Sequence, residues 1–238
     1  MQIFYAPDIE STLVLPEEES GHCVRVMRLA EGDEIMITDG KGNFYRASIT
    51  NAHPKHCQVE ITSSWQPEKP WDAYIHIAVA PTKNMDRMEW FAEKATEIGI
   101  DEITCLNCRF SERKEVKTAR LEKILVSAMK QSQKALLPQL NGMTDFKQFV
   151  RQPFNGRKFI AHCEEGEKPL IKSIYHPGEN VLILIGPEGD FSPEEIKSAE
   201  ENGFEAISLG KSRLRTETAA LTACHTIHVS VSYTHLTL

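Results

Sequence analysis

The alternation of apolar and polar residues changes character near residue 70 and divides the chain into two parts. Before that point the apolar runs are short and bounded by turn residues, which is typical of a β-rich unit. Residues 16–29 instead show helical spacing, with Cys23, Val24 and Met27 on the expected buried side. Residues 39–43 form a hairpin signal. The predicted strands of this part are 3–5, 13–15, 34–38, 44–50 and 58–62.

From Ala73 onward, apolar runs alternate with helical patterns, which is the signature of a parallel sheet flanked by helices. Pro67 and Pro70 forbid a regular strand or helix before it, so we place a linker near residues 66–72. The predicted strands are 75–80, 100–106, 159–162, 181–185 and 204–209, and the predicted helices are 86–98, 118–135, 193–202 and a last one from about residue 216. The predicted domains are therefore 1–68 and 72–230. Residues 231–238 lack helical patterning and are interpreted as a non-native tail.

Two glycine-containing loops follow the last two predicted strands. Gly186-Pro187-Glu188-Gly189 comes after five apolar residues, and Gly210-Lys211-Ser212-Arg213-Leu214-Arg215 comes after strand 204–209. Because ligands bind beyond the carboxyl ends of strands in open α/β sheets, we expect both loops to form one site. The second loop does not end a phosphate-binding P-loop, since Glu205 stands where that motif needs glycine. Taken alone, the first loop is also compatible with a simple tight turn, which is the less favoured interpretation.

The composition is that of a globular chain without a membrane span. The chain has 238 residues, 41% hydrophobic and 26% charged, and no apolar run approaches the ~20 residues that a spanning helix needs. We therefore expect a cytoplasmic protein.

A net charge of −7 argues by itself against a nucleic-acid partner. Screening makes local charge more important than the total, and basic residues cluster at 25–28, 109–123, 130–134 and 211–215. Each cluster alone is equally compatible with a solvated helix face.

The six cysteines give little support for a metal site. Only Cys105 and Cys108 have metal-like spacing, and a four-ligand zinc site needs a second pair. The cysteines are interpreted as reduced core thiols, and no metal is expected.

The two loops together carry a more specific signal. GPEGDFSPEEI (186–196) and LGKSRLRTETAALTA (209–223) resemble the motifs of the SPOUT superfamily of knotted methyltransferases, specifically the RsmE-type 16S ribosomal RNA uracil-N3-methyltransferases. The likeness extends to KNMDRMEW (83–90), KATEIG (94–99), SER (111–113) and Gln131-Ser132. HCVRVMRL (22–29) with Gly32-Asp33 resembles that family's PUA-like RNA-binding domain. Two positions depart from the family pattern: Asp190 stands where a third loop glycine is common, and Met27 where leucine is usual.

This resemblance implies a fold and a reaction. The fold is α/β, with a small N-terminal PUA-like β-barrel domain before a mostly parallel sheet that is flanked by helices and tied in a deep trefoil knot. The implied activity is methyl transfer from S-adenosylmethionine to N3 of a uridine in 16S ribosomal RNA of the small subunit. The implied assembly is a homodimer.

The resemblance also assigns roles to residues of this chain. Arg215 would stabilise the uracil anion, and Glu217 would orient Arg215 or take the N3 proton; a salt bridge between the two that merely closes the loop onto the helix is the alternative. The expected RNA contacts are Arg25, Arg28, Arg109, Arg113 and Lys134. The expected cofactor contacts are Leu184, Gly186, Glu188, Gly189, Leu209, Gly210, Leu214 and Thr218.

Two other functions stay open at this point. One keeps the superfamily but changes the reaction, to 2′-O-ribose or guanine-N1 methylation of tRNA. The other is a non-catalytic RNA-binding or assembly factor that merely retains the cofactor loops.

Overall fold

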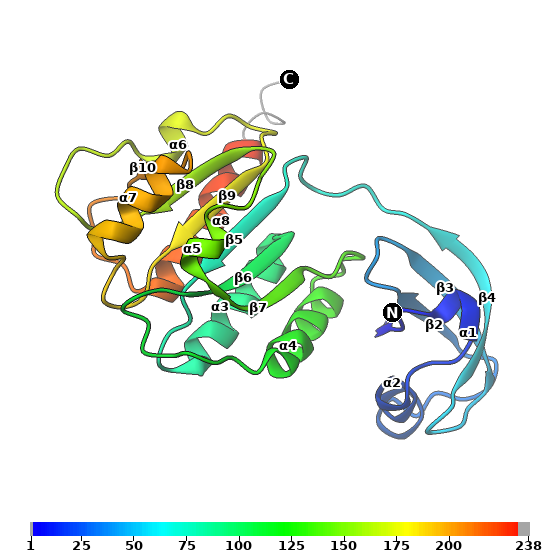
Figure 1. Cartoon of the computed structure of the whole chain (residues 1–238). Helices are drawn as coiled ribbons and strands as arrows, with labels where there is room; N and C mark the ends of the chain where they lie inside the picture. Colours follow the sequence, from blue (N-terminus) through cyan, green and yellow to red (C-terminus); the bar gives the residue numbers. More distant parts are fainter. Residues whose placement is uncertain (1, 233–238) are drawn as a thin grey trace. The chain divides into compact units, whose positions relative to one another are not determined.

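The structure of the protein is a computed structural model that describes residues 2–232 (Figure 1). Most of the segment interpreted as a non-native tail lies outside the described residues, although 231 and 232 belong to the last helix. The chain divides into an N-terminal unit, Met1–Lys69 with Val126–Leu137, and a C-terminal unit, Pro70–Leu125 with Pro138–Leu238. The segment 126–137 was not expected in the first unit, because nothing in its helical pattern distinguishes it from the rest of the predicted helix.

The N-terminal unit is built on a four-stranded sheet in the order β1-β2-β3-β4. Strand β1 (Ile3–Tyr5) is parallel to β2 (Glu34–Thr38), and β3 (Phe44–Asn51) and β4 (Gln58–Trp65) continue antiparallel. The predicted hairpin joins β2 to β3: Asp39 Oδ1 accepts hydrogen bonds from the backbone N–H of Lys41 and Asn43. The core of this unit includes Phe4, Ile35, Ile37, Tyr45 and Ala47.

Two predictions for this unit were wrong in detail. Residues 13–15 are not a strand: Leu13 has a φ of 52° and ends helix α1 (Ile9–Thr12), and Val14 makes one isolated bridge to Gln58. The predicted helix over 16–29 is divided into α2 (Glu17–Gly21) and a π-helical turn, His22–Val26. The wider π turn rotates the following residues, so Met27, expected inside, is 40% exposed.

The C-terminal unit contains the predicted parallel sheet, in the order β10-β8-β9-β5-β6-β7. Its strands are β5 (Ile75–Val79), β6 (Glu102–Asn107), β7 (Gln139–Asp145), β8 (Arg157–Ala161), β9 (Val181–Ile185) and β10 (Glu205–Ile207). Its longer helices are α3 (Met85–Ile98), the first part of α4 (Thr118–Gln131), α7 (Pro193–Glu201) and α8 (Thr216–Ser232), with single turns at α5 (Phe146–Phe149) and α6 (Ile171–Ile174). Residues 126–131 of α4 belong to the N-terminal unit.

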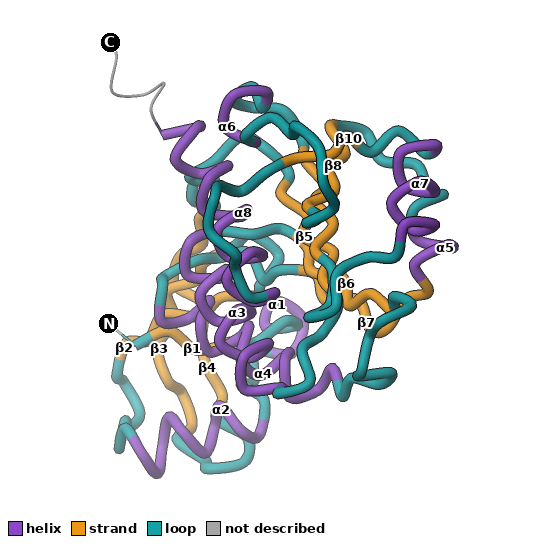
Figure 2. Tube along the Cα trace, turned by 90° about the vertical axis from the view of Figure 1, so that its left-hand side faces the viewer, coloured by secondary structure: helices purple, strands orange, loops and turns teal. Residues whose placement is uncertain are grey.

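Helices cover both faces of this sheet. Figure 2 shows α3 and α8 on one face and α5 and α7 on the other. All five residues of β9 are buried, as expected of a strand enclosed on both sides. Helix α7 begins with a capping box, in which the Ser192 side chain and the Glu195 carboxylate bind each other's backbone N–H.

Strand β7 was missed by the sequence analysis because its sequence, QLNGMTD, is polar and contains an Asn-Gly turn signal. It lies at the edge of the sheet and pairs only with β6. The side chain of Asn141 donates hydrogen bonds to Glu102 Oε1 (2.5 Å) and Thr104 Oγ1 (2.8 Å) on β6. Contacts with the neighbouring strand, rather than local propensity, therefore decide its conformation.

Glu102 and Thr104 also hold a buried histidine of β5. His76 Nδ1 lies 3.2 Å from Glu102 Oε2, and His76 Nε2 lies 2.8 Å from Thr104 Oγ1. Burial lowers the pKa of His76 to about 4, against an opposing contribution from Glu102. The imidazole is therefore neutral at pH 7, with Nδ1–H donating to the carboxylate and the threonine hydroxyl donating to Nε2.

Candidate active site

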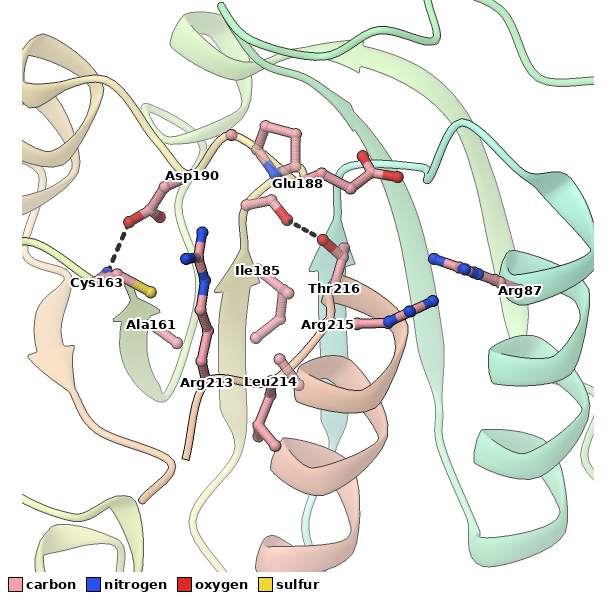
Figure 3. A pocket seen from close by; sticks show the side chains of 14 residues that line it. Arg87, Ala161, Cys163, Ile185, Glu188, Asp190, Arg213, Leu214, Arg215 and Thr216 are labelled. Atoms are coloured by element: carbon pink, nitrogen blue, oxygen red, sulfur yellow. Dashed lines mark hydrogen bonds between the residues drawn. The ribbon is translucent and has the colours of Figure 1, made fainter. Parts of the chain in front are cut away.

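The two glycine loops line a pair of adjoining cavities at the carboxyl ends of β8, β9 and β10. The β9 cavity, about 440 Å³, is bounded by the loop after β9 and the start of α8 (Figure 3). The β10 cavity, about 670 Å³, is bounded by the loops after β8 and β10. The residues that line both are Ala161, Cys163, Arg213, Leu214 and Ala219. Because they share these lining residues, the two cavities lie side by side and form one site, whose volume suits a small molecule.

The first loop is fixed by contacts at Gly186. The hydroxyl of Thr216, the first residue of α8, donates a 3.1 Å hydrogen bond to the Gly186 carbonyl oxygen. A Cβ at residue 186 would lie 3.1 Å from the Phe191 ring and 3.2 Å from the Phe191 backbone nitrogen. A side chain at residue 186 would therefore require Phe191 to move by a few tenths of an ångström.

Glu188 connects this loop to the end of β5. Its Oε1 accepts a 3.0 Å hydrogen bond from the backbone N–H of Lys83, just before α3. Gly189 lies against Phe110 of the loop after β6, where a Cβ would be 3.3 Å from the Phe110 Cβ. These contacts join the loop after β9 to the loops after β5 and β6.

Asp190 adopts a backbone conformation that glycine also adopts readily. Its φ is 67°, in the left-handed region that aspartate tolerates better than most residues. Asp190 Oδ2 accepts a 2.7 Å hydrogen bond from the Cys163 N–H, and Oδ1 accepts one of 2.8 Å from the Phe191 N–H. Burial and the charge of Asp190 raise the pKa of the Cys163 thiol.

In the second loop, Gly210 has a φ of 128°, a conformation that side chains rarely allow. No atom lies within 4 Å of the position that a Cβ would take. Its N–H donates to the hydroxyl of Ser208 at 3.2 Å. Leu209 and Leu214 give the β10 cavity apolar walls on either side of Gly210.

Most of the expected cofactor contacts lie in these cavities, but two do not. Leu184 is fully buried in the core with Ala78 and Phe191, while its neighbour Ile185 lines the β9 cavity, because successive strand residues face opposite sides. Thr218 lines neither cavity, whereas Thr216 does, because a two-residue step moves the side chain around the helix. The expected residues that do line the site are Gly186, Glu188, Gly189, Leu209, Gly210 and Leu214.

Arg215 and Glu217 do not pair with each other, which corrects the salt bridge considered as their alternative role. The Arg215 side chain lines the β9 cavity and has no ion pair or hydrogen bond among residues 2–232. Glu217 is 7% exposed, and its Oε1 lies 3.8 Å from Nε of Arg87 on α3. Its Oε2 is buried without a hydrogen-bond partner.

Sequence reasoning missed Arg87 as a site residue. It lies within the motif KNMDRMEW, but the motif alone does not indicate which side chains point toward the ligand. In the structure it lines the β9 cavity from the first turn of α3.

The expected RNA contacts are distributed over both units. Arg25 and Arg28 are exposed in the N-terminal unit, and Lys134 of the same unit is half-buried. In the C-terminal unit, Arg109 pairs with Glu194 at 3.0 Å. The Arg113 guanidinium donates to the carbonyls of Thr82 (3.2 Å) and Lys83 (2.6 Å), so part of its hydrogen-bonding capacity is used inside the protein.

The two cysteines with metal-like spacing are core residues. Cys105 and Cys108 are buried, and burial raises the pKa of the Cys105 thiol to about 12. Among the described residues no group of three histidine, cysteine or acidic side chains is arranged to hold a metal ion. In the same part of the chain, no helix combines the length and apolar character needed to span a membrane.

Comparison with known proteins relates both units to RNA methyltransferases. Residues 68–228 match the family model of an RNA methyltransferase domain, and residues 15–62 match that of an RNA methyltransferase PUA domain. The chain is similar to ribosomal RNA small subunit methyltransferase E of Synechocystis sp., with 28% identity over 93% of this chain and 75% of the relative.

Two solved structures resemble the whole chain. One is described as a probable rRNA-methyltransferase from Porphyromonas gingivalis, with 45% identity, a TM-score of 0.94, and coverage of 98% of this chain and 100% of that one. The other is ribosomal RNA small subunit methyltransferase E from Neisseria gonorrhoeae bound to S-adenosyl methionine, with 27% identity, a TM-score of 0.86, and coverage of 96% and 97%.

Proposed function

Because the chain belongs to the RsmE-type family of RNA methyltransferases, we propose that it methylates N3 of a uridine in 16S ribosomal RNA of the small subunit, using S-adenosylmethionine. The observation that carries the proposal is the meeting of the two motif loops around adjoining cavities at the carboxyl ends of β8, β9 and β10. The alternative of a tight turn alone does not account for this convergence.

The lining residues fit the proposed cofactor. The β10 cavity offers the apolar side chains of Leu209 and Leu214 and open space beside Gly210. The β9 cavity offers backbone groups of Gly186 and Gly189 with no side chain of their own in the way. We expect Ile185 and Thr216 to replace Leu184 and Thr218 in the contact set. When bound, S-adenosylmethionine supplies an electrophilic methyl group carried on a sulfonium.

Arg215 and Glu217 are proposed to act on the acceptor base. N3 of uracil carries a weakly acidic proton that must leave before its lone pair can attack. The Arg215 guanidinium, unpaired within the described chain and facing the β9 cavity, would stabilise the negative charge that develops on the uracil oxygens. Glu217 Oε2 is buried and has no hydrogen-bond partner among the described residues, so it is a candidate acceptor for the proton.

The N-terminal unit is proposed to bind RNA through the turn at 25–28. Arg25 and Arg28 are exposed there, and between them Val26 (65% exposed) and Met27 (40% exposed) present apolar surface to solvent. Arg28 adopts a φ of 57°, which holds the turn in an uncommon conformation. Cations that flank exposed apolar groups suit a partner that offers both phosphates and nucleobase faces.

The family likeness carries three further expectations: a homodimer, a trefoil knot in the C-terminal sheet and a cytoplasmic location. RNA contacts at Arg109, Arg113 and Lys134 stay predictions as well. Lys134 belongs to the N-terminal unit, and the other two belong to the C-terminal unit.

Two experiments test the proposed function. Purified small ribosomal subunits are incubated with the protein and labelled S-adenosylmethionine, and the modified nucleoside is mapped. 3-Methyluridine in 16S RNA is the expected product, whereas 2′-O-methylribose or 1-methylguanosine in tRNA would favour another reaction of the superfamily. Calorimetry with the cofactor separates an enzyme from an assembly factor: we expect micromolar binding that Gly210→Trp abolishes, and absence of heat with the unmodified chain would contradict the proposal.

A further inference from the structure

Arg87 presents an uncommitted guanidinium to the proposed active site. It lies in the first turn of α3 and lines the β9 cavity. Its Nε lies 3.8 Å from Glu217 Oε1. Within residues 2–232 the terminal nitrogens donate no hydrogen bond. The side chain is 38% exposed, so a large ligand can reach it.

Arg87 and Arg215 face each other across one end of this cavity. Figure 3 shows the Arg87 guanidinium extending from α3 toward that of Arg215 at the start of α8. Glu217 pairs with Arg87 and not with Arg215, and it contacts Arg87 through one oxygen only. Glu188 also lines the cavity, but its carboxylate already accepts from the Lys83 N–H. Two guanidinium groups therefore face the same space at this end of the cavity.

We propose that Arg87 binds a phosphodiester group of the RNA strand that carries the target nucleotide, and that Glu217 positions the Arg87 guanidinium. The inference rests on the proposed function. A guanidinium held at Nε directs its two terminal nitrogens outward as a fork that matches two phosphate oxygens. A phosphodiester carries one negative charge, which complements the two guanidinium groups that face this end of the cavity.

This site would fix the RNA backbone while Arg215 acts on the base. A base that reacts inside a cavity must leave its stack, and a fixed backbone next to it restricts the positions that the base can adopt. Arg87 therefore affects binding of the RNA more than it affects binding of the cofactor. It is a substrate-binding residue that sequence motifs alone do not identify.

The test compares Arg87→Gln and Arg87→Lys with the unmodified protein. For Arg87→Gln we expect a roughly tenfold higher KM for small-subunit RNA and a cofactor Kd within twofold. The slope of log KM against log salt should become smaller by about 0.7, the contribution of one phosphate contact to a single strand. Arg87→Lys keeps the charge but not the fork, so its salt slope should stay near that of the unmodified protein while its KM rises less.

Arg157→Gln is the matched control. Arg157 lies at the amino end of β8, paired with Glu205, and lines neither cavity. Its removal should leave the salt slope unchanged. The cofactor Kd of every variant, measured by calorimetry and compared with that of the unmodified protein, tests whether the pocket is still folded.

Two outcomes would overturn the inference alone. One is an unchanged KM and salt slope in Arg87→Gln. The other is a loss of cofactor affinity as large as the rise in KM, which would assign Arg87 to the carboxylate of the cofactor instead. Absence of RNA methylation by the unmodified protein would overturn the proposed function and this inference with it.

Discussion

The carboxylate of Asp190 accepts a 2.7 Å hydrogen bond from the backbone N–H of Cys163. This bond joins the loop after β9 to the loop after β8 at the wall between the two cavities, where Cys163 lines both. A glycine at 190 would permit the same backbone conformation but could not make the bond. Asp190 thus supplies a connection that the usual family residue at this position lacks.

Replacing Asp190 by glycine should weaken cofactor binding. The backbone keeps its left-handed conformation, but the N–H groups of Cys163 and Phe191 both lose the carboxylate that accepts from them. We expect a five- to tenfold higher cofactor Kd, which is about 1 kcal/mol and in the range that lost hydrogen bonds cost. Asp190→Asn keeps an acceptor oxygen and tolerates the same φ, so it should bind the cofactor nearly as well as the unmodified protein. Calorimetry measures both. Equal losses in the two variants would contradict a role for the hydrogen bond.

Gly210→Ala should damage the site through backbone conformation rather than through collision. Nothing lies within 4 Å of the added Cβ, but a φ of 128° is strained for alanine by roughly 1–3 kcal/mol. The loop would relax and move Leu209 and Leu214, so we expect both stability and cofactor affinity to fall. Gly178→Ala, with a φ of 87° and equally open surroundings away from the cavities, should lose stability only. Unchanged cofactor binding in Gly210→Ala would argue against the second loop as part of the pocket.

Arg215→Ala should cost far more in turnover than in cofactor affinity. If the guanidinium stabilises charge on the uracil in the transition state, kcat should fall by about 10²–10³, as for the loss of one oxyanion donor. The cofactor Kd should change by less than twofold. Single-turnover methylation and calorimetry give the two quantities. Equal losses in both would make Arg215 a structural residue.

The buried His76 should make the C-terminal unit less stable in acid. Its pKa is about 4 in the folded protein and near 6.5 when unfolded, so the unfolded state binds more protons between these values. The free energy of unfolding should therefore fall as pH drops from 6.5 to 4, by up to about 3 kcal/mol. Hydrogen exchange of the β5 amides at a series of pH values measures this free energy of unfolding. In His76→Gln the free energy of unfolding should change less with pH over this range. In His225→Gln, which replaces an exposed histidine, it should change as much as in the unmodified protein.

Much of the C-terminal unit could be predicted from local sequence alone. Five consecutive apolar residues indicate a buried strand at 181–185, and Ser192 with Glu195 indicates the helix start, because both signals depend on neighbouring residues only. The two loops were predicted for the same reason. Their convergence followed from the general position of ligand sites in parallel sheets.

Other features depended on contacts between distant segments. A strand that is apolar at every position does not reveal which face meets the ligand, so Leu184 was expected where Ile185 lies. Strand β7 has little apolar character and takes its conformation from hydrogen bonds to β6. The turn at 25–28 exposes Met27 because one π-helical turn changes the helical period that the pattern assumed.

The sequence by itself determined most of the strands and longer helices of the C-terminal unit, the two loops and the family, because these depend on residues that are adjacent in the chain. Only the tertiary structure decided that Glu217 pairs with Arg87 rather than Arg215, and that Asp190 binds Cys163. Each of these pairs joins two segments that lie together at the carboxyl ends of the parallel strands. Short-range periodicity carries no information on which side chains meet there, because that depends on the packing of whole elements.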